Sequence, residues 1–173
     1  MLSATTENPA ETREIAQRLA AVLRPGDVVA LEGELGAGKT TFVRGLAAGL
    51  GLDPNEVSSP TFVLCHEHDD GQGTLRLVHM DAYRLGDAAD LESFGGDELI
   101  AGSDAIVVVE WAERVTGSLP VARVTVRLEH AGADRRSIHI DASGPVAERV
   151  RQLDATGDLN PNRDRRRAAA PPD

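Results

Sequence analysis

The chain has 173 residues, of which 41% are hydrophobic and 27% charged, and this predicts one globular domain and excludes a fibrous or wholly disordered protein. The formal net charge of -10 excludes unassisted, non-specific binding to DNA or RNA, because an acidic surface repels phosphate backbones. A single cysteine and the lack of a long apolar segment or basic leader predict a cytoplasmic protein that does not enter a membrane.

Hydrophobic periodicity and turn residues predict alternating helices and strands along the chain. Asn8 with Glu11 three residues later marks the start of the first helix. The expected helices cover 9–23, 39–50, 87–94, 97–101 and 144–153. The expected strands cover 28–31, 61–66, 74–80, 105–109, 123–129 and 137–140. The strands at 61–66 and 74–80 are predicted to form one hairpin, and those at 123–129 and 137–140 a second.

The last part of the chain has a different composition. Residues 1–155 are predicted to form a single domain, whereas 156–173 combine an arginine cluster with alanine and proline. Because this stretch offers no apolar face to bury, it is predicted to be a disordered tail.

A complete phosphate-binding motif stands between the first predicted strand and the second helix. Its residues match the pattern G-x-x-x-x-G-K-[ST] and are Gly33, Glu34, Leu35, Gly36, Ala37, Gly38, Lys39 and Thr40. The glycines let backbone N–H groups turn toward phosphate oxygens, and the following helix adds the positive end of its dipole. The motif and its setting predict an α/β fold: a three-layer P-loop NTPase sandwich with a mixed, partly parallel sheet and antiparallel hairpin additions.

Three side chains of this segment are assigned to ATP and its metal ion. Lys39 is expected to bridge the β and γ phosphates, and Thr40 to offer its hydroxyl to Mg²⁺. Thr41 lies one residue further into the same turn, where it can bind the α phosphate. The alternative, an ordinary surface lysine after a glycine-rich turn, requires the whole pattern to arise by chance.

Two carboxylates directly follow predicted strands and are candidates for both catalysis and metal binding. Asp81 follows the strand at 74–80 and Glu110 the strand at 105–109, at the edge where open α/β sheets bind ligands. Asp81 is expected to hold Mg²⁺ directly or through water, and Glu110 to orient or deprotonate the attacking water. The division of these roles between the two residues stays open.

Several further residues are expected near the phosphates from their positions along the chain. Ser59 and Thr61 follow the second helix, where nucleotide hydrolases place a loop that senses the γ phosphate, although Ser-Pro pairs are also common loop elements. Trp111 directly follows Glu110 and fits either the core or a place against the nucleotide. The grouping of His79, Tyr83 and Arg84 around Asp81 also indicates a functional surface. Arg84 is the internal candidate for an arginine finger.

Four segments in this order make the sequence closely resemble the TsaE family. They are 33–41, S-P-T-F at 59–62, H-M-D-A-Y-R-L at 79–85 and V-E-W at 109–111. The resemblance spans roughly residues 11–127, and the combination of the last three segments is far more specific than a phosphate loop alone. The tail after Ala155 has no counterpart in the family pattern.

The resemblance implies a bacterial ATPase required for the threonylcarbamoyladenosine (t6A) modification of tRNA. In this reading the chain joins TsaB and TsaD and hydrolyses ATP with Mg²⁺ to support repeated turnover, while TsaD moves threonylcarbamoyl onto a tRNA adenosine. The tRNA is then reached only through the complex. By motif, the resemblance implies that Lys39, Thr40 and Thr41 bind the phosphates and the metal ion. It also implies that Asp81 and Glu110 are the functional carboxylates and that Trp111 lies near the nucleotide.

Two alternatives from other classes remain at this point. A small-molecule kinase on the same scaffold would need an acceptor-binding region and usually a lid that carries arginine, and the only insertion available, 87–102, has no arginine. A nucleotide-gated assembly factor would use ATP to control a complex, and hydrolysis would be incidental. An ATPase assay with and without partners and candidate acceptors distinguishes these functions.

Overall fold

The computed structural model describes residues 2–101 and 104–155. Its strands are β1 (Leu2–Thr6), β2 (Val28–Glu32), β3 (Cys65–Asp69), β4 (Arg76–Asp81), β5 (Ile106–Glu110), β6 (Val124–His130) and β7 (Arg136–Ala142). Its α-helices are α1 (Pro9–Ala20), α2 (Lys39–Gly49), α3 (Ala88–Ser93), α4 (Gly96–Ala101) and α5 (Val146–Ala155). Two short 3-10 helices follow β5, namely η1 (Ala112–Arg114) and η2 (Thr116–Ser118).

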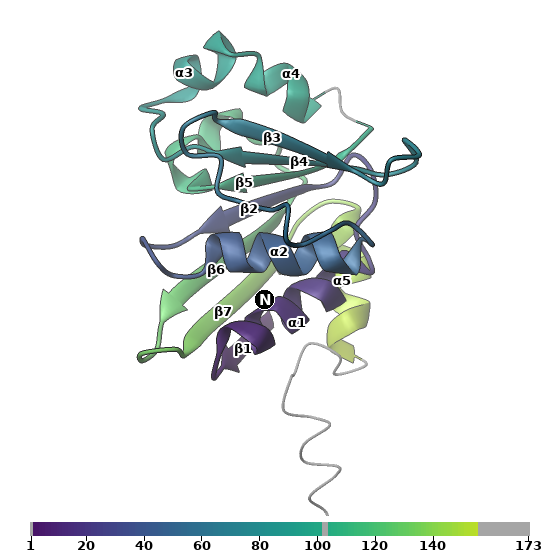
Figure 1. Cartoon of the computed structure of the whole chain (residues 1–173), viewed down its shortest axis with the longest axis vertical. Helices are drawn as coiled ribbons and strands as arrows, with labels where there is room; N and C mark the ends of the chain where they lie inside the picture. Colours follow the sequence, from purple (N-terminus) through teal and green to yellow (C-terminus); the bar gives the residue numbers. More distant parts are fainter. Residues whose placement is uncertain (1, 102–103, 156–173) are drawn as a thin grey trace, which may run out of the picture.

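The strands form one 7-stranded sheet in the order β1-β7-β6-β2-β5-β4-β3 (Figure 1). Its centre is parallel, because β2 pairs in parallel with β5 and β6, and β4 pairs in parallel with β5. Both edges are antiparallel, with β3 on β4, and β7 between β6 and β1. The predicted α/β fold with a mixed sheet and hairpin additions is therefore confirmed. The carboxyl ends of β2, β4 and β5 meet at one edge of the sheet.

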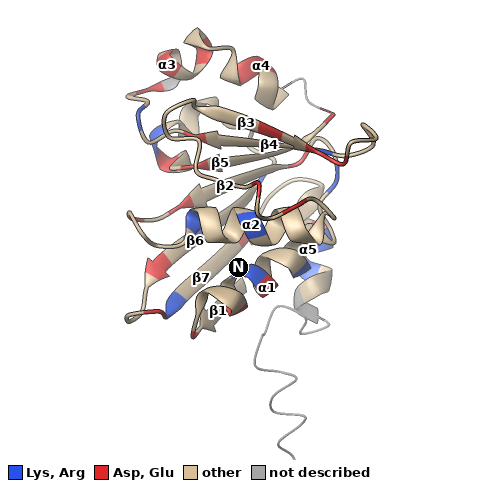
Figure 2. Cartoon of the chain, viewed as in Figure 1, with Lys and Arg blue, Asp and Glu red and all other residues tan. Residues whose placement is uncertain are grey.

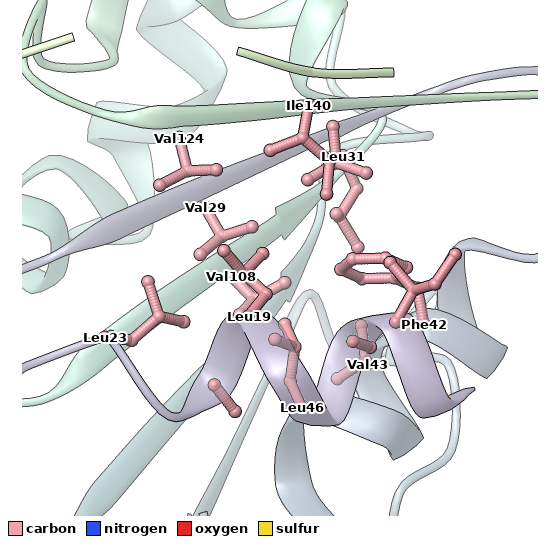
Figure 3. Packing of buried hydrophobic residues seen from close by; sticks show 14 of the residues in the cluster. Leu19, Leu23, Val29, Leu31, Phe42, Val43, Leu46, Val108, Val124 and Ile140 are labelled. Carbon is pink, nitrogen blue, oxygen red and sulfur yellow. The ribbon is translucent and has the colours of Figure 1, made fainter. Parts of the chain in front are cut away.

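Helices cover both faces of the sheet. On one face α1, α2 and α5 share a hydrophobic cluster with the strands. Figure 3 shows helical side chains of this cluster facing those of the sheet, among them Leu19, Phe42 and Leu46 opposite Val29 and Leu31. Full burial of such a side chain stabilises the fold by about 1.5–3 kcal/mol. On the other face α3, α4 and η1, together with Val115 and Leu119 on either side of η2, close a second cluster over β2, β4 and β5.

Two strands differ from the prediction. The strand expected at 61–66 begins only at Cys65, because the chain first turns so that the N–H groups of Val63 and Leu64 both donate to the carbonyl of Pro60. Leu64 takes a left-handed conformation with a φ of 68° and redirects the chain into β3. The strand β1 was not predicted, since its few residues become a strand only by pairing with β7.

The terminal helices also shift. The helix expected at 9–23 ends at Ala20, where Val22 and Leu23 close a turn onto the carbonyls of Leu19 and Ala20. The last helix begins at Val146 rather than at 144. The predicted disordered tail, 156–173, lies outside the described residues, so its disorder and the domain limit at 155 stay predictions. In the part of the chain that the structure describes, no helix is both long enough and apolar enough to cross a membrane.

Gly45 marks a close approach of α2 to α1 and supports a stability prediction. A Cβ at this position would lie 2.4 Å from the carbonyl oxygen of Arg13 and 2.6 Å from Cβ of Ala16. Helix propensity alone favours Gly→Ala by about 1 kcal/mol. The clash with backbone outweighs this gain, so we expect Gly45→Ala to lower the free energy of unfolding by about 1–3 kcal/mol in urea denaturation.

Gly117→Ala serves as the control for this substitution, because a Cβ there meets nothing within 4 Å. We expect its free energy of unfolding to stay close to that of the native chain. A stabilised Gly45→Ala variant would show that the two helices can separate at little cost.

Candidate nucleotide-binding site

The loop between β2 and α2 has a backbone that requires glycine. Gly33 and Gly36 have φ values of 142° and 75°, and Gly38, which precedes α2, has a φ of 104°. A Cβ on Gly33 would lie 2.3 Å from the carbonyl oxygen of Leu128, so β6 leaves room only for hydrogen. The loop consequently curls over the first turn of α2, whose N–H groups have no partners within the helix and suit an anion.

A cavity of about 550 Å³ opens beside this loop and gathers most of the predicted site. It is lined by Leu35, Gly36, Gly38, Lys39, Thr40, Thr41, Ser59, Thr61, Asp81, Tyr83, Glu110 and Trp111. Three residues of the phosphate-binding motif lie elsewhere. Gly33 and Glu34 line a neighbouring cavity of about 530 Å³ that also contacts Trp111, and Ala37 is fully buried.

Lys39 is turned back onto its own loop. Its Nζ donates to the carbonyl oxygens of Gly33 and Glu34, at 2.5 and 2.9 Å, and lies 3.6 Å from the ring centroid of Trp111. Burial lowers the pKa of this ammonium below its ordinary value, and the nearby carboxylate of Glu110 offsets part of that effect. The cation is therefore held where phosphate oxygens can take over its hydrogen bonds.

Glu110 lies beside the first turn of α2. The Thr40 hydroxyl lies 2.9 Å from Oε1 and 3.2 Å from Oε2 of Glu110, and Nε2 of His79 lies 2.9 Å from the same Oε1. Only 3% of Glu110 is exposed. The carboxylate is thus held between β4 and α2 by two neighbours that are distant in sequence.

Asp81 is the partner of Glu110 in the β4–β5 register but has different contacts. Its Oδ2 accepts from the hydroxyls of Ser59 at 2.8 Å and Thr61 at 2.6 Å. Its Oδ1 accepts from the backbone N–H of Tyr83 at 2.8 Å. Asp81 therefore ties the 59–61 loop to the carboxyl end of β4.

Aromatic rings form one wall of the cavity. The ring centroids of Tyr83 and Trp111 are 5.0 Å apart, and Trp111 has a left-handed φ of 58°. The guanidinium of Arg114 lies 5.3 Å from the Tyr83 ring. Arg84 instead lies 5.8 Å from the ring of Phe62 and does not line the cavity. Of the arginines in residues 2–101 and 104–155, none lines it.

Two residues of the β6–β7 hairpin that support the loop were not predicted. Arg136 donates from Nε to the carbonyl of Ala37 and from Nη2 to that of Gly36, both at 3.0 Å. Nε2 of His130 lies 3.3 Å from the carbonyl of Leu35. No motif indicated these contacts, because their positions lie about 100 residues from the loop and resemble ordinary hairpin charges.

A buried strand, a curled glycine loop, a helix that begins with Lys-Thr and an acid at the end of the neighbouring parallel strand define the P-loop NTPase fold. A family model described as "Threonylcarbamoyl adenosine biosynthesis protein TsaE" matches residues 6–138. The chain belongs to the TsaE family.

Relatives and a solved structure agree with this placement. The chain is 46% identical over 139 residues to a Bacillus subtilis protein named tRNA threonylcarbamoyladenosine biosynthesis protein TsaE, covering 80% of this chain and 84% of that protein. It is 43% identical over 147 residues to a protein of the same name from Streptomyces coelicolor, covering 84% and 89%. The crystal structure of YdiB from Bacillus subtilis superposes with a TM-score of 0.72 at 39% identity and covers 90% of this chain and 95% of YdiB.

The contact between Lys39 and Trp111 predicts a spectroscopic response to nucleotide. Lys39 is the only lysine and Trp111 the only tryptophan in the sequence, so each gives an unambiguous signal. We expect Mg²⁺ with ADP or ATP to draw Nζ of Lys39 off the indole, which changes the fluorescence of Trp111 in a saturable way. The ¹³Cε resonance of selectively labelled Lys39 should move away from its ring-shifted position in the same titration.

Calorimetry on the same sample provides the control for this prediction. A flat response of both signals, while calorimetry shows that the nucleotide binds, would mean that Lys39 keeps its contact with Trp111 in the bound state.

Proposed function

We propose that the chain is a Mg²⁺-dependent ATPase that acts with TsaB and TsaD to support the transfer of threonylcarbamoyl to a tRNA adenosine. Membership of the TsaE family supports the pathway, t6A biosynthesis. The observation that carries the chemistry is the hydrogen bond between Thr40 and Glu110, which lies directly after a phosphate loop whose backbone requires glycine. Hydroxyl and carboxylate oxygens suit Mg²⁺, which typically takes one or two carboxylates beside phosphate oxygens.

Each group of the phosphate loop has a role in this proposal. Backbone N–H groups of 33–41 bind the phosphates, and Lys39 exchanges the carbonyls of Gly33 and Glu34 for the β and γ phosphates. Thr41 lines the cavity one residue beyond Thr40 and contacts the α phosphate. Mg²⁺, held by Thr40, supplies charge neutralisation of the phosphates when bound.

The contacts favour one division of the carboxylate roles. Glu110 is the acid bonded to Thr40, so we assign it to the metal side of the site. Asp81 is bonded to Ser59 and Thr61, so we assign it to the side where the γ phosphate and the attacking water meet the 59–61 loop. This arrangement exchanges the roles expected first from the sequence, and the variants in the Discussion test it.

Two surface features support the binding of protein partners. Large apolar side chains are exposed near the cavity: Leu35 is 80%, Phe62 86% and Val63 61% exposed. Figure 2 shows acidic residues on α3 and α4, and the chain has a net charge of -10. The acidic surface supports a complex in which TsaB and TsaD, rather than this chain, hold the tRNA.

The kinase alternative receives no support from the insertion that it would need. Helices α3 and α4 occupy this insertion, and their Leu91 and Ile100 pack with Val78 and Val107 on the sheet face opposite α2. Within the described residues, these two helices therefore cover the core and do not line the phosphate cavity.

The proposal is tested by measuring ATP hydrolysis of the purified chain, alone and with TsaB and TsaD, at fixed Mg²⁺. We expect slow hydrolysis that rises with the partners, because the cavity lacks an arginine among the described residues and a cation supplied in trans accelerates phosphoryl transfer. In cells depleted of the chain, t6A in tRNA should fall and return only with a hydrolysis-competent copy. Full t6A with a copy that binds but does not hydrolyse ATP would support the assembly-factor alternative instead.

A further inference from the structure

We propose that His79 is a positioning residue that holds the carboxylate of Glu110 against Thr40, an inference that rests on the proposed nucleotide-binding function. His79 lies on β4, and Glu110 ends the neighbouring parallel strand β5. Its Nε2 is 2.9 Å from Oε1 of Glu110. The Thr40 hydroxyl is also 2.9 Å from this oxygen, so one carboxylate oxygen receives contacts from both β4 and α2.

The geometry gives each of the three groups one defined direction. A carboxylate only accepts, so the imidazole donates from Nε2 and the threonine hydroxyl donates its single hydrogen to Glu110. The hydroxyl lone pairs of Thr40 then remain available on the side away from Glu110. Fixing Glu110 with His79 therefore fixes the hydroxyl orientation that a cation at Thr40 requires.

The burial of His79 argues against a role in packing alone. No part of His79 is exposed, and Leu77, two residues earlier on the same face of β4, is equally buried with an apolar side chain. Within the described residues, Nδ1 of His79 has no hydrogen-bond partner. Burying an imidazole with one unpaired nitrogen stabilises the fold less than burying a leucine would. The hydrogen bond to Glu110 is the polar interaction that offsets this burial cost.

His68 provides a matched comparison on the adjacent strand. Its ring centroid lies 6.4 Å from that of His79, and its Nε2 is also buried without a partner in the described residues. Since it does not contact Glu110, its replacement changes a neighbouring, half-buried imidazole and leaves the carboxylate contact intact.

The experiment compares His79→Leu, His79→Asn and His79→Gln with His68→Leu in the full chain. A glutamine amide reaches about as far as Nε2 of histidine, whereas asparagine is too short to meet Oε1 of Glu110. The readouts are the melting temperature, the affinity for ADP by calorimetry with and without Mg²⁺, and the Mg²⁺ concentration for half-maximal ATP hydrolysis. The Leu and Asn variants should need about 10- to 100-fold more Mg²⁺ for half-maximal hydrolysis, or show a kcat that is lower by about the same factor.

Three further results are expected if His79 acts through Glu110. ADP affinity without Mg²⁺ stays unchanged, His79→Gln recovers most of the loss, and His79→Leu adds nothing in a Glu110→Gln background. His68→Leu should behave like the native chain. The inference is overturned if His79→Leu and His79→Asn keep native Mg²⁺ dependence, if Gln is no better than Asn, or if the losses add to that of Glu110→Gln.

Failure of this inference is distinguishable from failure of the proposed function. A native chain that binds Mg²⁺-ADP but hydrolyses no ATP would contradict the ATPase proposal, and the Mg²⁺ effect on ADP affinity would still decide the role of His79. If His79→Leu does not fold, the comparison between Asn and Gln decides it alone.

Discussion

Replacing Lys39 by alanine is expected to weaken binding of Mg²⁺-ATP by about 10- to 100-fold and to bring hydrolysis below detection. The substitution removes the cation that faces the phosphates. It also removes the two hydrogen bonds to Gly33 and Glu34 that hold the ammonium in the loop. Calorimetry for binding and phosphate release for hydrolysis measure the two effects separately.

The matched variant for this test is Lys39→Met. Methionine keeps an unbranched, apolar stem that can pack against Trp111 but carries no charge. We expect the same loss of binding in both variants and a melting temperature close to that of the native chain. Retention of ATP affinity in either variant would contradict the assignment of the phosphate loop.

The second large effect should separate the two carboxylates. Glu110→Gln is expected to reduce hydrolysis by about 100-fold or more and to raise the Mg²⁺ concentration that binding requires, because the anion beside Thr40 is lost. Asp81→Asn is expected to reduce hydrolysis to a similar degree while Mg²⁺-ADP affinity stays unchanged, because its contacts are with Ser59 and Thr61. Calorimetry at several Mg²⁺ concentrations and steady-state hydrolysis measure both.

A third variant provides the control for the Asp81 assignment. Thr61→Val removes one of the hydroxyls that donate to Asp81 and leaves the carboxylate charge in place. We expect it to reduce hydrolysis less than Asp81→Asn does. If Asp81→Asn abolishes the effect of Mg²⁺ on ADP affinity and Glu110→Gln leaves it intact, the metal belongs with Asp81 and the roles are those expected first from the sequence.

The parts of the site that could be predicted from sequence are those whose residues are adjacent in the chain. The phosphate loop is a contiguous motif, and its glycines are required by local φ values and by the close approach at Gly33. The buried run before it and the acids after two further strands also indicated a parallel sheet that ends at one edge, which the register of Asp81 with Glu110 confirms.

Two parts of the fold could not be predicted, one because it depends on pairing with a distant segment and one because a turn replaces the expected strand. The strand β1 exists through its ladder with β7, and neither its length nor its composition marks it out. The turn at 61–64 is β-prone by composition, yet two N–H groups converge on the carbonyl of Pro60 and delay β3 to Cys65. Pairing with a distant segment therefore makes β1 a strand, whereas hydrogen bonds within the turn override the β-propensity of residues 61–64.

By itself the sequence indicated a phosphate-binding loop, the family and the order of the elements other than β1 and the two 3-10 helices, because a phosphate cradle needs consecutive residues with particular backbone freedom. The tertiary structure decided which acid stands next to Thr40, that His79 supports it, and that Arg136 holds the carbonyls of Gly36 and Ala37. These contacts join residues from different strands and helices, and their chemistry depends on separations of a few ångströms across the sheet. A linear pattern carries no such distances, since side chains that follow different strands meet only when those strands pair in one register.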